Sequence, residues 1–180
     1  MKEGTEKEGL KAELVLRVQL AAPDPAVVVD YAALVNSICK PPFPVKAEDI
    51  HVRQMRLLSD ALIEGYNLRV PTNELKSFLS LIQSAPLIIG HDHEGIPIGR
   101  WFGGEIIKLG DVSWAAPLIY WMRGVPGDEM AKNLDGGIYR DVSASFRWTT
   151  SECSICGQTI YACPHVPGGE YGGAICFIWT

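Results

Sequence analysis

The cysteines of this chain are concentrated near its C-terminal end. Four of the five lie in the stretch ECSICGQTIYACPHVPGGEYGGAIC, which runs from Glu152 to Cys176, and only Cys39 stands apart. Two thiolates separated by two residues can bind one metal ion from a single tight turn, and a second pair of donors completes a tetrahedral site. In an intracellular chain such clustering favours metal binding over disulfides. The sequence therefore predicts a small Cys-rich lobe, shaped like a zinc knuckle, over residues 151–180.

The spacing of the cysteines and one histidine predicts which residues bind the metal. Cys153 and Cys156 form a Cys-x-x-Cys pair followed by glycine, and Cys163 and His165 form a second pair. Zinc suits this donor set, and a closed set of four protein donors indicates a structural role, because a catalytic zinc keeps an open position. Cys176 is the alternative fourth ligand if His165 serves elsewhere. If no metal binds, the cysteines of the lobe are interpreted as reduced thiols in a compact structure.

The remainder of the chain has the composition of a globular protein. Of its 180 residues, 47% are hydrophobic and 21% are charged, which is enough to bury a core and unlike a disordered chain. No apolar run approaches the roughly 18 residues of a membrane-spanning helix, and the N-terminal MKEGTEKEGLK lacks the apolar core of a signal peptide. We expect a charged tail over residues 1–12 and one domain over residues 13–150, with the Cys-rich lobe packed on it.

Strand-like segments outnumber helix-like ones and do not alternate with them in βαβ order. The clearest helix opens at Thr72, which can cap it, because Leu75 and Phe78 begin a helical apolar spacing. Pro117 falls within a predicted strand and is expected at an edge or a bulge. This balance predicts an α+β fold, a mostly antiparallel β-barrel or sheet with a few flanking helices. The predicted strands cover residues 13–20, 50–58, 86–90, 98–109 and 111–122, and the other predicted helices cover residues 26–39 and 127–133.

A strand with a serine at its centre follows the last predicted helix. In GGIYRDVSASFRW, residues 136–148, period-two alternation places Ser143 on one face with Asp141 and Ser145. A serine hydroxyl becomes a good nucleophile when an adjacent base, usually an imidazole, takes its proton. The candidate bases are His91 and His93 in HDHEGIPIGR. If these residues have no catalytic role, the serine segment is interpreted as a solvated strand and the histidine segment as a polar loop.

These two motifs, in this order, resemble those of the capsid maturation (prohead) proteases of tailed bacteriophages, which are relatives of the herpesvirus assemblins. In that family a His-Asp pair precedes a Pro-[Ile/Leu]-Gly-[Arg/Lys] stretch, here His91–Asp92 and Pro97–Arg100. A later glycine-initiated segment delivers a Val/Ile-Ser-x-small-Phe strand, here Val142–Phe146. A subset of the family carries the same Cys-Ser-Ile-Cys-Gly and Cys-Pro-His wording after that strand. The resemblance covers roughly residues 50–176.

The resemblance implies an assemblin-like fold and a serine endopeptidase that needs no cofactor for catalysis. Ser143 is then the nucleophile and His91 the general base, preferred to His93 because it directly precedes the aspartate. Ser145 stands where the family usually has glycine. The family's third catalytic member is a second histidine or an acidic residue, and His165 can either orient His91 or bind metal. The candidates for that member are Glu170, His165, Glu152 and Asp141.

The resemblance also implies partners and a place of action. The substrates are then capsid precursor or scaffold proteins, cut inside the assembling procapsid in the host cell cytoplasm by a protease expected to be a homo-oligomer. Relatives usually continue beyond the apolar run at residues 176–180, so further strands are expected to complete their fold. The alternative is a non-catalytic, zinc-stabilised capsid-associated module derived from such a protease. The net charge of −5 argues against a nucleic-acid-binding zinc ribbon.

Overall fold

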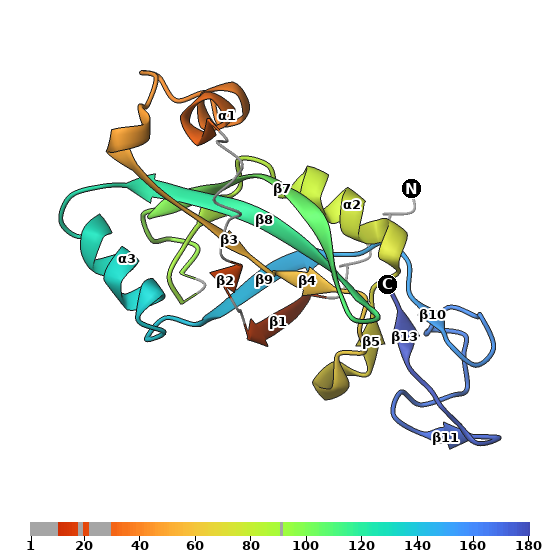
Figure 1. Ribbon diagram of the computed structural model, residues 1–180. Helices are drawn as coiled ribbons and strands as arrows, with labels where there is room; N and C mark the ends of the chain where they lie inside the picture. The colour runs from red at the N-terminus through yellow and green to blue at the C-terminus, as the bar shows by residue number, and fades with distance from the viewer. Residues whose placement is uncertain (1–10, 18–19, 22–29, 91) are drawn as a thin grey trace.

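An antiparallel sheet that curls into a half-barrel forms the body of the protein (Figure 1). The structure is a computed structural model, and it describes residues 11–17, 20–21, 30–90 and 92–180. The strand order of the sheet is β2-β3-β8-β7-β6, with β4 also paired to β8, and every pairing is antiparallel. The strands are β2 (Leu20–Ala21), β3 (Ile50–Met55), β4 (Leu58–Ser59), β6 (Pro86–Leu87), β7 (Gly99–Leu109) and β8 (Val112–Met122).

The long hairpin of β7 and β8 contains a bulge beside a proline. The register between the two strands shifts between Phe102 and Glu105. Pro117 of β8 has no N–H to donate to the ladder, and Gly104 of β7 packs so closely that a Cβ there would lie 2.4 Å from the Pro117 Cα. The predicted association of Pro117 with a bulge is thus confirmed, although the bulge is on the partner strand and β8 is a central strand.

Three α-helices flank the sheet within the described part of the chain. They are α1 (Tyr31–Ile38), α2 (Thr72–Leu81) and α3 (Gly127–Asp135), and short 3-10 turns cover Ala47–Asp49 and Glu64–Tyr66. Helix α2 buries Leu75 and Phe78 in the main core, which also holds Trp101 and Trp121. Helix α1 packs on a smaller core around Phe102. None of these helices is long and apolar enough to cross a membrane.

The serine strand, β9 (Asp141–Arg147), lies outside the half-barrel sheet. It pairs antiparallel with β1 (Lys11–Arg17) over its whole length, and no other strand of the described residues pairs with it. Ala144 is buried and the Phe146 ring packs against Phe78 at a centroid distance of 5.7 Å, so one face of β9 covers the core. The alternation predicted from the sequence is confirmed, and Ser143 belongs to the other face.

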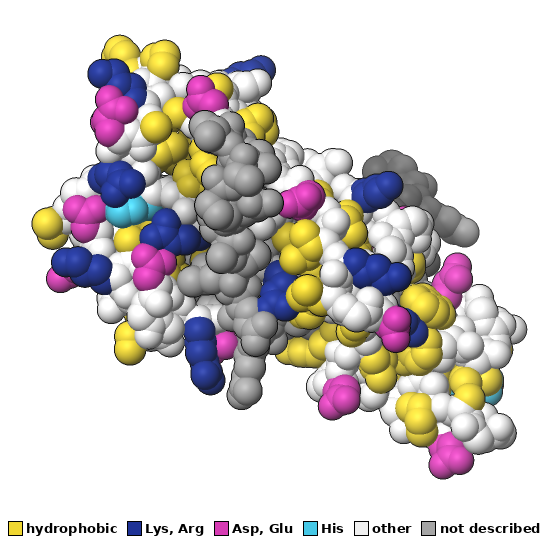
Figure 2. Space-filling view, viewed as in Figure 1, with side chains coloured by type: hydrophobic (Ala, Val, Ile, Leu, Met, Phe, Trp, Pro, Cys, Tyr) yellow, Lys and Arg dark blue, Asp and Glu magenta, His cyan; other side chains and the backbone are white. Residues whose placement is uncertain are grey.

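The Cys-rich lobe joins the body through very short strands. Strand β13 (Ile178–Trp179) pairs antiparallel with β10 (Glu152–Cys153) and parallel with β5 (Leu68–Arg69), and β11 (Glu170–Tyr171) pairs with β12 (Ala174–Ile175). In Figure 1 the lobe lies at the end of the body remote from α1 and α3. Figure 2 shows apolar side chains gathered over β5 and β13, where body and lobe meet.

Several predicted boundaries were wrong. The predicted strand over residues 50–58 divides into β3 and β4, the one over residues 86–90 shortens to β6, and the helix over residues 127–133 extends to Asp135. The serine strand begins only at Asp141, because a turn follows α3 and leaves Ile138 71% exposed. Strand β1 starts at Lys11, within the predicted tail. Residues 1–10, 18–19 and 22–29, which include parts of the predicted tail, first strand and first helix, lie outside the described residues.

The predicted cap of α2 was also wrong. Thr72 is the first residue of the helix and Pro71 occupies the cap position, with no side-chain cap. The Thr72 hydroxyl instead donates a hydrogen bond of 2.7 Å to the Asp60 carboxylate, which also accepts the Ser113 N–H at 2.9 Å. A buried carboxylate needs such donors, and it takes the hydroxyl away from the helix end.

Candidate functional site

A groove of about 1160 Å³ runs along β9 between the two sheets. This volume exceeds the roughly 300–1,000 Å³ of ordinary small-molecule pockets. Its lining side chains are mostly apolar and come from α2, from the segment around β6 and from the core, as with Leu81, Ile89 and Trp101. Leu81 and Ile89 are 81% and 68% exposed. The groove therefore offers a mostly apolar surface bordered by residues 141–147 of β9.

Residues of both faces of β9 border the same groove, among them residues that can take part in chemistry. Ser143 and Ser145 of β9 are among its lining residues, together with His93. Ser143 is half-buried, whereas Ser145 is exposed. The structure thus brings the proposed nucleophilic strand and the predicted histidine-containing turn to one groove, although they are far apart in the sequence.

His91 itself lies outside the described residues. Its neighbour Gly90 lines the groove, as does His93 two positions later. Between them, the Asp92 carboxylate accepts backbone N–H groups of Glu94 and Gly95, both at 3.1 Å, and thereby closes the turn. The carboxylate of the His-Asp pair therefore supports the backbone of this turn.

The four candidates for a third catalytic member separate into two groups. Asp141 and Glu152 line the groove with Ser143. His165 and Glu170 are not among the described residues that line it, because His165 lies in the cysteine cluster and Glu170 lies in β11.

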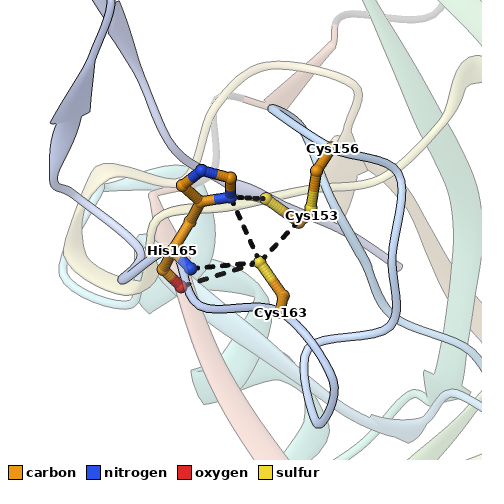
Figure 3. A group of neighbouring side chains, drawn as sticks. All are labelled: Cys153, Cys156, Cys163 and His165. Carbon is orange, nitrogen blue, oxygen red and sulfur yellow. Dashed lines mark hydrogen bonds between the residues drawn. The ribbon is translucent and has the colours of Figure 1, made fainter.

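The cysteine cluster brings together the four residues predicted as metal ligands. One donor atom from each of Cys153, Cys156, Cys163 and His165 lies within 4.8 Å of all the others (Figure 3). The Nδ1 of His165 lies 3.6 Å from the Cys153 sulfur and 3.4 Å from the Cys163 sulfur, and the Cys156 and Cys163 sulfurs are 3.5 Å apart. Donors about 2.0–2.3 Å from a tetrahedral zinc are separated by roughly 3.5–3.8 Å. The cluster could therefore hold a metal ion, and its geometry is compatible with zinc.

Cys176 adds a further sulfur beside this cluster. It is fully buried, and its sulfur lies 3.6 Å from that of Cys153, but it does not belong to the group of four mutually close donors. Burial raises the pKa of the Cys176 thiol, and the neighbouring Cys153 raises it further. Burial and neighbouring thiols also raise the pKa of Cys163, so the distances, and not the pKa values, separate Cys176 from the four mutually close donors. The geometry thus favours His165 over Cys176 as the fourth donor.

Local backbone structure prepares the cluster for a cation. Burial alone raises the pKa of the Cys153 thiol, but N–H groups of Cys156 and Ile155 outweigh this effect and lower the pKa to about 6. Burial and the neighbouring Cys153 and Cys156 raise the pKa of Cys163 to about 11. Adjacent thiolates repel one another, and a bound dication removes this repulsion and favours ionisation of all of them.

An aromatic residue holds the histidine of the cluster. The Tyr171 ring packs edge-on against His165 at a centroid distance of 4.4 Å, and its hydroxyl accepts the Val166 N–H at 2.8 Å. This packing restricts the orientation of the His165 ring. No role for Tyr171 follows from the sequence, because its proximity to His165 depends on the β11–β12 turn, which the residue spacing does not reveal.

Comparisons of the chain with protein-family models, with curated proteins and with solved structures find no match. The function is therefore inferred from the residues of the groove and of the cysteine cluster.

Proposed function

We propose that the protein is a serine endopeptidase with Ser143 as nucleophile and His91 as general base. The observation that carries the proposal is that half-buried Ser143 shares a groove with Gly90 and His93, which bracket His91 in the sequence. A groove of about 1160 Å³ has room for a segment of polypeptide. Under this proposal an extended substrate pairs with β9, which is paired with β1 in the described part of the chain.

The proposed reaction follows the general chemistry of serine acyl transfer. The Ser143 oxygen adds to the scissile carbonyl while His91 takes its proton, and His91 then gives that proton to the departing amine. The resulting ester is hydrolysed by water, with His91 again as the base. Asp141 and Glu152 are the better candidates to orient His91, because both line the groove, whereas His165 is engaged in the cysteine cluster.

We also propose that the metal of the Cys-rich lobe is zinc in a structural role. Cys153, Cys156, Cys163 and His165 supply four donors at distances compatible with a tetrahedron, which leaves no position for a substrate. His165 then serves the metal, and Cys176 is not needed as a ligand. Zinc supplies a crosslink between turns that have little regular structure of their own.

The proposed substrates are capsid precursor or scaffold proteins. The support is the resemblance of the ordered HDHEGIPIGR and VSASF motifs to phage prohead proteases, with which an antiparallel half-barrel body is consistent. Under this proposal the body is assemblin-like, the protein assembles as a homo-oligomer, and it acts inside the procapsid in the host cytoplasm.

A non-catalytic, zinc-stabilised capsid module is the second candidate function. The observation that favours it is Ser145, which stands where the resemblance expects glycine and is exposed on the groove beside Ser143. A side chain at this position narrows the space in which a substrate backbone can approach β9.

A fluorophosphonate probe distinguishes the two candidates, because it phosphonylates only an activated serine. Intact-mass spectrometry should show one adduct on the unmodified protein and none on Ser143→Ala. Ser145→Ala is the matched control on the same strand face, and it should keep the adduct. If the unmodified protein gains no adduct, the peptidase proposal fails and the structural module is favoured.

A further inference from the structure

The cysteine cluster and the groove share a stretch of chain. Glu152, Trp179 and Thr180 line the groove, and Glu152 directly precedes the metal-site residue Cys153 in β10. Glu152 is paired with Trp179 in the register of β10 and β13, and Cys153 is paired with Ile178. One short ladder thus carries a metal ligand and two groove-lining residues.

The ladder is short and is extended by two hydrogen bonds of 2.9 Å, from the Ser154 N–H to the Phe177 oxygen and from the Phe177 N–H to the Ser154 hydroxyl. Strands β5, β10 and β13 each have only two residues, and isolated strand pairs of this size are marginal. Backbone hydrogen bonds from Ile178 to Asn67 (2.8 Å) and from Thr180 to Arg69 (3.1 Å) connect it to the body. The Arg69 guanidinium carbon lies 5.3 Å from the centroid of the Trp179 ring. Strands this short open more easily than the long hairpin of β7 and β8.

The four metal-site residues come from two separate segments of the lobe. Cys153 ends β10 and Cys156 lies in the turn that follows it, whereas Cys163 and His165 lie in the next segment, which has turns, irregular chain and one isolated β-bridge at Thr159. Besides the cluster, the segments are joined by the Glu152–Thr159 bridge and by backbone hydrogen bonds from Cys153 to Gln158 (2.8 Å) and from Ile160 to Ser151 (3.2 Å). A bound metal therefore fixes the Cys153 end of β10, and through the ladder it restrains Trp179.

We propose that the metal ion held by Cys153, Cys156, Cys163 and His165 positions Glu152 and Trp179, and thereby fixes one part of the groove wall. This inference rests on the metal binding in the proposed function and adds to it that the metal acts on the groove and not only on the lobe. Glu152 and Trp179 are positioning residues in this account. Metal loading then sets the shape of the wall that a groove ligand meets.

Hydrogen–deuterium exchange with mass spectrometry tests this inference without a known ligand. The protein is purified with zinc and compared with Cys156→Ser, whose side chain is exposed, so that its loss removes a donor with little effect on packing. Exchange should increase about tenfold or more in residues 149–153, 177–180 and 67–70. It should stay unchanged in residues 99–122 of the β7–β8 hairpin.

Two further variants distinguish the effect of losing the metal from a general loss of stability caused by replacing a cysteine. Cys156→His keeps a nitrogen donor for zinc and should restore slow exchange to the unmodified level. Cys39→Ser removes the one cysteine outside the lobe and should change neither zinc content nor exchange in the three segments.

Increased exchange confined to residues 154–176, with Glu152, Trp179 and β5 unchanged, would overturn the inference. Hydrogen exchange reports on backbone amides, so its result does not depend on whether the protein is a peptidase. If Ser143 fails to react with a fluorophosphonate while exchange increases at Glu152 and Trp179 in Cys156→Ser, the peptidase proposal falls and the positioning role stands.

Discussion

Arg53 binds Asp135 through two parallel hydrogen bonds, from Nε to Oδ1 at 2.7 Å and from Nη2 to Oδ2 at 2.6 Å. The pair joins β3 to the last residue of α3, only six residues before the serine strand begins. At the other end of α3, Asp128 lies 2.6 Å from His51, which is also in β3. The half-barrel thus anchors both ends of the helix that leads into the serine strand.

Replacing Arg53 should measurably weaken this anchoring. Lysine keeps the charge but cannot form two parallel bonds to a carboxylate, so Arg53→Lys should lower the free energy of unfolding by on the order of 1 kcal/mol. Urea unfolding measures this change. Lys46→Gln breaks an exposed 3.9 Å pair with Glu48 and is the control, with no change expected. Equal effects of the two substitutions would mean that the Arg53 pair adds nothing.

The bulge of the β7–β8 hairpin requires glycine at position 104. Its φ is +102°, and a Cβ there would lie 2.4 Å from the Pro117 Cα and 2.7 Å from the Ala116 oxygen. We expect Gly104→Ala to destabilise the protein by more than about 2 kcal/mol in thermal or urea unfolding. Gly110 provides the control. Its φ is +60°, but no atom lies within 4 Å of a Cβ added there, so Gly110→Ala should lower the free energy of unfolding by only about 1 kcal/mol.

Asp60 makes stability depend on acid pH. Burial raises the pKa of its carboxyl, but hydrogen bonds from Thr72 and Ser113 and the charge of Arg69 outweigh burial and lower the pKa below the ordinary 3.8. A pKa lowered by folding adds stability that is fully present above the unfolded pKa and is lost as pH falls through the folded pKa.

Asp60→Asn should therefore be less stable at neutral pH, by about 1–3 kcal/mol, because an amide nitrogen cannot accept the Thr72 hydroxyl. Urea midpoints of the two proteins should converge as the pH falls below about 4 and Asp60 of the unmodified protein becomes protonated. The exposed turn carboxylate Asp111 provides the control, since Asp111→Asn should leave the pH profile unchanged. If the difference in urea midpoint between the unmodified protein and Asp60→Asn stayed constant down to low pH, it would contradict the lowered pKa of Asp60.

Zinc content tests which residues bind the metal. The purified protein should contain one zinc ion per chain by elemental mass spectrometry, and Cys163→Ser should lose it, because a donor at the centre of the cluster is removed. Cys176→Ser should retain zinc, with an affinity change within the roughly 10–100-fold range of outer contacts. Zinc loss in Cys176→Ser but not in His165→Ala would instead assign Cys176 as the fourth ligand.

Much of the local pattern followed from the sequence. The alternation around Ser143 predicted which face of β9 covers the core, and the Cys-x-x-Cys and Cys-x-His spacing predicted the residues of the cysteine cluster, because both depend on short-range geometry. Thr72 was wrongly predicted as a cap, since a buried carboxylate twelve residues earlier takes its hydroxyl. Local spacing carries no information about such a partner.

The connection between lobe and groove could not have been predicted. It depends on the two-residue strands β5, β10 and β13, which are too short to leave a periodic pattern. The sequence also left open whether His165 serves the metal or His91. The distances of its Nδ1 from two cysteine sulfurs favour the metal, and the absence of His165 from the described lining of the groove agrees with that role.

Intact-mass spectrometry after co-expression with the presumed capsid precursor tests the central claim most directly. The account predicts new precursor fragments with the unmodified protein and none with Ser143→Ala, while both proteins stay folded and keep their zinc. The fragment masses would also give the cleavage site. The same fragments with Ser143→Ala, or an uncut precursor with both proteins, would contradict the assignment of Ser143 as the nucleophile of an endopeptidase.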